Sequence, residues 1–498
     1  MSVLAIDAGT TGVTALIVTA DGTVAGRGYQ EFRQYFPEPG WVEHLPEGIW
    51  HATLAACAQA LSSAGSPALA CVGITNQRET AVIWDRTTLT APRRAIVWQD
   101  RRTAAICAAL REQGHEPRVS ALTGLRIDPY FTATKLTWLA QNEPSVWAGV
   151  EDGSLAVGTV DSYLVARLTG GRRHVCDASN ASRTLLFDIE DGQWSAELCS
   201  LFGVPPHALP EVVPSTGIVG QTDPAAFLDL SVPIAGIAGD QQAALFGQAC
   251  FAVGAAKCTY GTGSFVLVNT GPSVVRSHAG LLSTVAWMQP SGELTYALEG
   301  AVFVTGAVIQ WLRDGLGLLD DAAQSEGLAR SVPDSGGVVF VPALTGLGAP
   351  DWDPDARGAM FGLTRGTTRA HLVRAALEAI AFEVRDVFDV MTAEADARAG
   401  RALAGDLALR VDGGASANDL LMQLQADQIQ VPVERPVVAE TTALGAAFLA
   451  GLAAGVWSSA DELAATWQLD RRFTPGQRDD SAHARWRSAV ERTKGWAR

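Results

Sequence analysis

Short apolar runs separated by glycine- and threonine-rich turns open the chain. The runs at residues 3–7 (VLAID) and 14–19 (TALIVT) flank the first such turn. A third run, at 23–28 (TVAGRG), follows Asp21-Gly22, a dipeptide typical of tight hairpin turns. This spacing predicts an antiparallel three-stranded meander.

Strand-like and helix-like patterns alternate after the meander. Apolar runs of strand length occur at 68–75 (ALACVGIT), 80–85 (TAVIWD) and 92–98 (PRRAIVW). Helical patterns occupy 48–64 and 101–114. This alternation predicts an α/β fold.

A second hairpin of the same kind is expected at residues 256–272, where the turn YGTGS joins two apolar runs. Two hairpins with the same kind of Gly/Thr turn predict a duplication within the chain. The expected fold has two similar lobes with a cleft between them, rather than a solenoid of many short repeats. We place the boundary within 246–257, giving lobes at 1–246 and 247–498. The Ala- and Gly-rich tract at 442–457 predicts a tightly packed core helix, and a polar, helical segment should follow residue 460.

The composition indicates a folded protein and argues against several kinds of partner and site. The 498 residues are 48% hydrophobic and 18% charged, which is typical of a folded protein. A formal net charge of −16 argues against nucleic acid or an anionic membrane as a partner. The seven cysteines lack C-x-x-C spacing, so a disulfide framework or zinc site is not expected. The N-terminus lacks the pattern of a signal peptide, and a cytoplasmic location is expected.

Arg78 and Glu79 are the first candidate site residues, because they follow the apolar run at 68–75. Adjacent residues within a continuing strand point to opposite faces. At a strand end both can face one cleft, where a guanidinium donor and a carboxylate acceptor suit a ligand rich in hydroxyl groups.

The turn DAGTTG (7–12) is a candidate phosphate site. Gly9 allows close backbone approach, while Thr10 and Thr11 add hydroxyls to exposed backbone N–H groups. Asp7 could hold magnesium through water. An ordinary hairpin turn is an equally good interpretation of this motif alone.

Two further strand ends carry polar or glycine residues. Asp240 follows an apolar strand ending at Gly239, where it could be a helix cap or a base that accepts a hydroxyl proton. In RVDGGASAND, Gly413 and Gly414 would admit an adenine ring and Asn418 would offer a polar contact, or the motif is simply a helix start. Neither a P-loop nor a strand-placed GxGxxG occurs, which disfavours dinucleotide binding.

Taken together, these motifs resemble the FGGY carbohydrate kinases of the actin/hexokinase/Hsp70-like ATPase superfamily, and within them the glycerol kinases. The resemblance extends to about residue 457. It is carried by DAGTTG, GWVEH, GITNQRET, AIVWQDRRTA, GLRIDPYF, GTVD, NASRTLLF, GIAGDQQAALFGQ, YGTG, YALEGAVF, IQWLRD, PALTGLGAPDWDPDARGAMFGLTRG, RVDGGASAN and the tract at 442–457.

The resemblance implies two ribonuclease-H-like lobes and ATP-dependent phosphorylation of glycerol to sn-glycerol 3-phosphate, with ATP and Mg2+ as cofactors and a homodimer or homotetramer as the assembly. It implies Asp240 as general base and Asp7 as the magnesium-side carboxylate. The implied substrate-binding residues are Arg78, Glu79, Trp98, Tyr130, Asp240, Gln241 and Phe265. The implied nucleotide-binding residues are Thr10, Thr11, Gly12, Thr262, Gly306, Gln310, Gly414 and Asn418.

Alternatives are a kinase for another short polyol or ketose and a protein-binding ATPase module. The first turn also departs from most glycerol kinases: Ala8 replaces a glutamine, and Gly12, Val13 and Thr14 replace Ser-Ser-Arg. Loss of that arginine predicts a changed ATP affinity or rate. The loop 221–232 lacks the Gly-Gly-Thr-Arg and the histidine used for regulation in some members.

Overall fold

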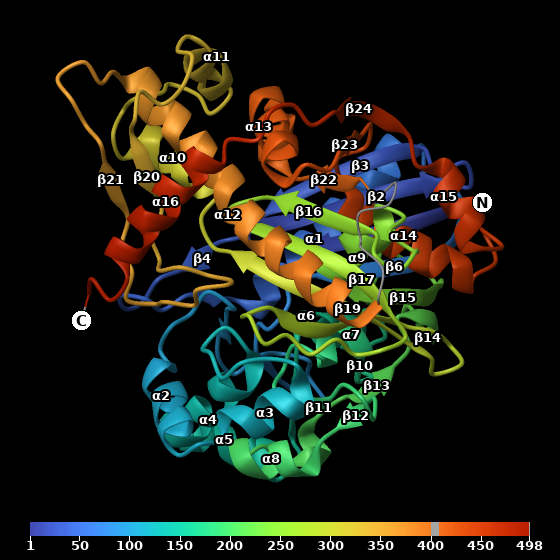
Figure 1. Cartoon of the computed structure of the whole chain (residues 1–498). Coiled ribbons are helices and arrows are strands. Elements are labelled where there is room, and N and C mark those ends of the chain that lie inside the picture. Colours follow the sequence, from blue (N-terminus) through green and yellow to red (C-terminus); the bar gives the residue numbers. More distant parts are fainter. Residues whose placement is uncertain (400–407, 498) are drawn as a thin grey trace.

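A computed structural model describes residues 1–399 and 408–497, and two large β-sheets organise it (Figure 1). The N-terminal sheet has the strand order β14-β15-β6-β1-β2-β3. Its strands are β1 (Ser2–Ala8), β2 (Gly12–Thr19), β3 (Val24–Glu31), β6 (Leu69–Asn76), β14 (Thr216–Gln221) and β15 (Pro233–Gly239). The predicted meander β1-β2-β3 is confirmed, with both pairs antiparallel.

The C-terminal sheet has the order β18-β19-β17-β16-β22-β23-β24. Its strands are β16 (Ala256–Tyr260), β17 (Ser264–Gly271), β18 (Leu282–Met288), β19 (Leu294–Val302), β22 (Leu409–Asp412), β23 (Val433–Pro436) and β24 (Leu469–Phe473). Here β16 and β17 form the predicted second hairpin, and β16, β22 and β23 run parallel.

The two sheets share one layout. In the N-terminal sheet, β1 pairs with β2 in antiparallel fashion on one side and begins the parallel run β1-β6-β15 on the other. In the C-terminal sheet, β16 does the same with β17 and with β22-β23. An antiparallel strand follows the last parallel strand in each, β14 and β24 respectively. The predicted duplication and α/β class are therefore confirmed.

Two helices lie between the sheets: α9 (Asp240–Gly247) and α14 (Thr441–Ala453). One buried cluster joins apolar residues of β1, β15 and α14 with residues of β17 and β18. Glycine lets these helices approach closely, because a Cβ on Gly445 would lie 1.8 Å from the Ala243 carbonyl oxygen and one on Gly247 2.0 Å from that of Thr441. The core helix predicted at 442–457 is therefore the element that ties the lobes together.

The remaining helices cover the outer faces and form additions. Helix α1 (Pro46–Ser63) packs on β2 and β3, and α12 (Arg369–Ala399) packs against β17 and β19. Short helices gather at the bottom of Figure 1, and a second addition contains α10, α11, α16, β20 and β21 at the upper left. The bounds of these elements are α2 (Ala104–Glu112), α3 (Glu116–Thr123), α4 (Thr132–Asn142), α5 (Pro144–Glu151), α6 (Val160–Leu168), α7 (Ala178–Ala181), α8 (Ala196–Phe202), α10 (Gly306–Asp314), α11 (Gln324–Arg330), α13 (Asp419–Ile429), α15 (Ala460–Thr466), α16 (Asp480–Thr493), β20 (Val339–Val341) and β21 (Ala359–Phe361).

Several short strands complete the fold: β4 (Gln34–Tyr35), β5 (Glu43–His44), β7 (Val82–Asp85), β8 (Ala95–Ile96), β9 (Leu155–Gly158), β10 (Val175–Asp177), β11 (Phe187–Asp188), β12 (Gln193–Trp194) and β13 (Glu211–Val213). The run at 92–98 gives only the two-residue β8, because its partner β5 is equally short. The segment after residue 460 is not wholly helical, since β24 pairs with β23 at the sheet edge.

All seven cysteines are buried, and none forms a disulfide among the described residues. No helix of residues 1–399 and 408–497 is both long and apolar enough to cross a bilayer.

Candidate active site

Asp7, Arg78 and Asp240 lie at one edge of the N-terminal sheet, at or just beyond the ends of three neighbouring parallel strands. Asp7 lies near the end of β1, Arg78 two residues beyond β6, and Asp240 directly after β15. The carboxyl ends of adjacent parallel strands form the usual binding crevice of such sheets. Here the Arg78 guanidinium Nε lies 3.1 Å from Asp240 Oδ1. The sheet topology therefore groups three residues that the sequence places far apart.

Arg78 is held by the other lobe. Its Nη1 and Nη2 donate to the two carboxylate oxygens of Glu299 at 2.6 and 3.0 Å, a bidentate pair. Nη2 also donates to the Tyr130 hydroxyl at 3.2 Å. Arg78 and Glu299 are both buried, and β19 carries Glu299, so the pair joins the N-terminal and C-terminal sheets.

Glu79 lies beside Arg78 in a strained backbone conformation. Its φ of 61° is in the left-handed region, which non-glycine residues adopt only when their surroundings enforce it. Arg183 Nε donates to Glu79 Oε1 at 2.7 Å. The Glu79 carbonyl accepts from Thr132 Oγ1 and Lys135 Nζ, and Lys135 Nζ also donates to the Tyr130 carbonyl at 2.6 Å. These contacts fix the carboxylate on the same side as the Arg78 guanidinium.

Arg183, Glu299 and Lys135 were not among the predicted site residues. The first two lie in segments that carry the family resemblance, NASRTLLF and YALEGAVF, yet they have no local charged partner. Their partners are 104 and 221 residues away along the chain. A usable signal was present: a charge inside an otherwise apolar strand or helix must be paired when it is buried.

Burial and ion pairing set the charge states in this cluster. Burial alone would raise the pKa of Glu299, but Arg183 and Arg78 lower it to about 2. Burial raises the pKa of Glu79 and of Asp240 despite the nearby guanidiniums. Burial and the charge of Asp240 raise the pKa of Asp7 to about 7. Raised pKa values in a cleft are typical of groups that exchange protons or bind cations.

Three aromatic rings adjoin the cluster. The Trp98 ring contacts Tyr130 and Phe265 edge-on, with centroid distances of 5.6 and 6.4 Å. The Arg78 guanidinium lies 5.9 Å from the Phe265 ring centroid. Trp98 Nε1 also donates to Thr10 Oγ1 at 3.0 Å, which connects this wall to the first phosphate turn. The predicted aromatic residues are therefore brought together.

The first turn is compact and partly accessible. The Gly9 N–H donates to the Gly12 carbonyl at 3.0 Å, and Thr11 is exposed. Gly12 has a packing role of its own, because a Cβ there would lie 2.8 Å from the Gln30 carbonyl oxygen. Its glycine identity is explained by this contact with β3.

The second turn lies against the start of α10. The Gly306 N–H donates to the Gly261 carbonyl at 2.9 Å, and a Cβ at Gly306 would lie 2.7 Å from that oxygen. Thr262 is exposed at the turn, and Gln310 is exposed one helical turn after Gly306. Because residues four apart share a helix face, Gln310 extends the surface that begins at the turn.

The two glycines of the third turn, Gly413 and Gly414, have different surroundings. Gly413 has a φ of +84°, and a Cβ there would lie 2.5 Å from the Tyr260 carbonyl oxygen, so its backbone path demands glycine. A Cβ on Gly414 would meet no atom within 4 Å, which leaves open space there. Asn418 caps α13, because its Oδ1 accepts from the Leu421 N–H at 2.9 Å, and its Nδ2 donates to Ser325 Oγ. Part of the Asn418 amide is therefore engaged within the protein.

A magnesium ion at the first turn would have few ligands from protein side chains. No group of three or more His, Cys, Asp or Glu side chains among the described residues is arranged as a direct cage. Asp7, with its pKa raised by burial and by a neighbouring carboxylate, is a group that a cation would stabilise in the charged form. Magnesium keeps several waters and takes one or two carboxylates, so the donor set is compatible with it.

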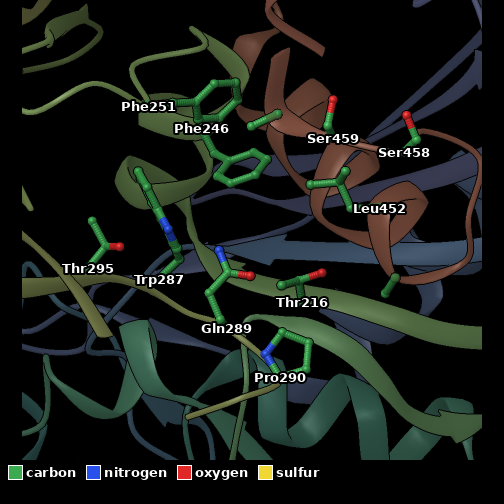
Figure 2. Close-up of a pocket in the computed structure, with 12 residues that line it drawn as sticks. Thr216, Phe246, Phe251, Trp287, Gln289, Pro290, Thr295, Leu452, Ser458 and Ser459 are labelled. Atoms are coloured by element: carbon green, nitrogen blue, oxygen red, sulfur yellow. The ribbon is translucent and has the colours of Figure 1, made fainter. Parts of the chain in front are cut away.

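A pocket elsewhere on the molecule does not suit a phosphorylated ligand. It lies where α9, α14, β14 and β18 approach one another, and Figure 2 shows Phe246, Trp287 and Leu452 beside Thr216 and Gln289. Its lining contains no charged side chain, so phosphate would find no counter-charge there. The candidate active site remains the cluster around Arg78.

Comparison with known proteins agrees with this geometry. The N-terminal domain model of the FGGY family of carbohydrate kinases matches residues 2–247, and the C-terminal domain model matches residues 256–454. A protein named glycerol kinase from Aromatoleum aromaticum is 57% identical over 99% of both chains, and one from Symbiobacterium thermophilum is 53% identical over 99% of both. The crystal structure of Plasmodium falciparum glycerol kinase with ADP superposes with a TM-score of 0.88 at 35% identity, over 99% of this chain and 98% of that one. The chain therefore belongs to the FGGY family of carbohydrate kinases.

Proposed function

We propose that this protein is a glycerol kinase, which transfers the γ-phosphoryl group of ATP to a terminal hydroxyl of glycerol and yields sn-glycerol 3-phosphate. The high identity to glycerol kinases over almost the whole chain supports this activity. The observation that carries the proposal is the buried Arg78–Glu299 pair with Asp240 3.1 Å from the same guanidinium. A protein-binding ATPase module has no need of such a polar pocket.

Glycerol binds at this cluster. Arg78 donates to hydroxyl oxygens and Glu79 accepts hydroxyl protons, with Asp240, Gln241 and the Tyr130 hydroxyl completing the set. Trp98 and Phe265 line the three-carbon chain. Charged partners strengthen these hydrogen bonds. An analogue without a hydroxyl leaves buried groups unpaired, so its kcat/KM should be lower than that of glycerol by about 10⁴-fold or more.

Asp240 is the general base. Its carboxylate accepts the proton of the attacking hydroxyl, and burial raises its pKa toward the range in which a carboxylate can take up a proton. Phosphoryl transfer is otherwise a matter of in-line positioning and charge stabilisation. Closure of the lobes excludes water, which would otherwise compete as the acceptor.

The nucleotide lies opposite the glycerol site and is held by the three glycine turns. Thr10, Thr11 and Gly12 with Thr262 face the phosphates, while Gly306, Gln310, Gly414 and Asn418 surround the nucleoside. Asp7 would hold a hydrated Mg2+, and such an ion would supply positive charge to the phosphates.

The two proposed binding sites are divided between the two predicted lobes. Residues 1–246 supply most of the polyol site and the first phosphate turn, and 247–498 supply most of the nucleotide site. Glu299 and Phe265 of the second lobe contact Arg78, which supports a polyol site that draws on both lobes. A homodimer or homotetramer and a cytoplasmic location stay predictions.

A substrate panel tests the proposal. ADP formation is measured with ATP and Mg2+ in the presence of glycerol, dihydroxyacetone, erythritol, xylitol and D-xylulose. The product is identified by phosphorus NMR, and a stereospecific sn-glycerol-3-phosphate dehydrogenase distinguishes it from its enantiomer. Glycerol should give the highest kcat/KM and the product sn-glycerol 3-phosphate. A four- or five-carbon substrate with the highest kcat/KM would assign the chain to another FGGY specificity. ATP hydrolysis that glycerol does not stimulate would reject kinase activity toward glycerol.

A further inference from the structure

A buried lysine in the second hairpin contacts one of the predicted substrate residues. Lys257, the second residue of β16, is fully buried. Its Nζ donates to Gln241 Oε1 at 2.5 Å and to Thr259 Oγ1 at 2.8 Å. Gln241 belongs to α9 and Lys257 to the C-terminal sheet, so this contact crosses from the helix at the substrate cluster to the other lobe.

The contact determines which way the Gln241 amide faces. A lysine ammonium can only donate, whereas an amide has one accepting oxygen and one donating N–H₂ group. The oxygen must therefore face Lys257, and the N–H₂ group lies on the other branch of the amide. Within the described residues, that Nε2 atom makes no hydrogen bond, so it is free to donate to a ligand.

The ammonium also contributes charge to the cluster. Burial lowers the pKa of Lys257 and Arg78 lowers it further, while Asp412, Cys258 and Asp240 raise it and favour the ammonium form. Burial raises the pKa of the Cys258 thiol to about 12, which leaves it neutral, and Asp412 already accepts from Gln248 Nε2 and Thr441 Oγ1.

Asp240 faces several charges from different elements. Arg78 and Lys257 favour its ionised form, while Glu299 opposes it, and Asp240 and Asp7 disfavour each other's ionisation. Lys257 is thus one of the two cations that offset the burial of Asp240.

We propose that Lys257 is a positioning residue of the phosphoryl-transfer site, which fixes the Gln241 amide with its N–H₂ group available as a donor and places a buried positive charge near Asp240. This rests on the proposed function, because it assumes that Asp240 accepts a proton and that Gln241 contacts the substrate. The role is distinct from that of a packing residue, because it depends on charge and on donor capacity.

The test compares Lys257→Met with Lys257→Arg and Thr259→Val. The first removes the charge and the donor at similar length, the second keeps both, and the third removes the other acceptor but keeps the charge. For each variant, kcat and KM for glycerol are measured from about pH 5 to about pH 9, and thermal unfolding confirms a folded protein. The acid limb of the kcat/KM profile reports ionisation of the proposed base, Asp240.

We expect Lys257→Met to lower kcat by about 10²-fold or more and to move the acid limb to higher pH by about one unit, because Asp240 loses a stabilising cation. Lys257→Arg should return the limb toward its wild-type position, and Thr259→Val should leave the limb unmoved. A folded Lys257→Met protein with the wild-type limb and a kcat within about three-fold of wild type would overturn the inference.

A further variant covers the case in which Lys257→Met does not fold. Gln241→Glu keeps an acceptor for Lys257, replaces the N–H₂ donor with a second carboxylate oxygen and adds a negative charge that Lys257 can pair, so it should fold and lose glycerol turnover by about ten-fold or more. Retained turnover would overturn the inference. If the wild-type protein itself does not turn over glycerol, the proposed function fails and this inference fails with it. If wild type is active and the variants behave like it, only the inference fails.

Discussion

Arg78 and Glu299 form a bidentate ion pair between the lobes, with Nη1–Oε2 and Nη2–Oε1 distances of 2.6 and 3.0 Å. Arg78 comes from the end of a strand in the N-terminal sheet, and Glu299 from the middle of β19 in the C-terminal sheet. The donor proposed for the substrate is thus oriented by the opposite lobe before any ligand arrives. Such preorganisation reduces the entropy lost on binding.

Glu299→Gln should both destabilise the fold and weaken glycerol binding. The change leaves the buried guanidiniums of Arg78 and Arg183 with less counter-charge, and removing one partner of a buried pair costs about 3–5 kcal/mol. Urea unfolding measures the stability, and the KM for glycerol should rise. Glu197→Gln is the matched control, because Glu197 and Arg118 form an exposed ion pair that water and salt screen. Equal effects of the two changes would contradict the account.

Lys135→Met should raise the KM for glycerol more than it lowers the kcat. Lys135 Nζ donates to the carbonyls of Glu79, Tyr130 and Phe131, so it binds together the two loops that carry substrate-binding residues. Without it, the strained backbone at Glu79 loses a restraint, and we expect a KM increase of about ten-fold. Steady-state kinetics with glycerol check this, and an unchanged KM in a folded variant would reject the positioning role.

Asp7→Asn should stabilise the protein at alkaline pH. The pKa of Asp7 is raised to about 7 by burial and by Asp240, from 3.8 for an unperturbed carboxyl group. The folded state therefore binds more protons than the unfolded state between these values, and ionisation of Asp7 costs stability as pH rises through about 7.

Removal of the carboxyl group relieves that cost, so the variant should be more stable than wild type at pH 8, by roughly 1–3 kcal/mol. The advantage should shrink as pH falls toward about 4, where the folded-state carboxyl group is protonated and the unfolded-state group is about half protonated. Urea unfolding at the two pH values measures the difference. A variant less stable than wild type at pH 8 would show that the Asp7 charge is satisfied by the fold.

Gly414→Val should weaken ATP binding without unfolding the protein. A Cβ at this position meets no atom within 4 Å, so the side chain would project into the space proposed for the nucleoside. We expect the KM for ATP to rise by about ten-fold or more with little change in Tm. Gly327→Val is the control, because Gly327 is equally open but lies on α11. An unchanged KM for ATP at Gly414→Val would move the nucleoside site elsewhere.

Local sequence patterns predicted the elements that carry the site. Both Gly/Thr hairpins, the strands before Arg78 and Asp240, and the helix after Asn418 form as expected, because alternation and turn residues act over a few positions. The duplication followed from the two hairpins alone. The chain after residue 460 was predicted less well, since the exposed edge strand β24 has a polar sequence that gives no apolar alternation.

Ion pairs between residues far apart in the sequence could not be predicted from local patterns. Glu299 neutralises Arg78 across 221 positions and Arg183 neutralises Glu79 across 104, and no local pattern specifies such a pair. The two glycines at 413 and 414 looked equivalent, yet only the structure shows that one accommodates the Tyr260 backbone and the other borders open space. The same limit applies to Lys257, whose importance emerges from its contact with Gln241.

The Asp240→Asn variant tests the central claim most directly. Asn is nearly isosteric and retains an acceptor oxygen beside Arg78, but it cannot take the proton of the attacking hydroxyl. Glycerol binding is measured by calorimetry and turnover by glycerol-dependent ADP formation. The account predicts binding within about ten-fold of wild type and a kcat lowered by about 10³-fold or more. A kcat close to that of wild type would contradict it.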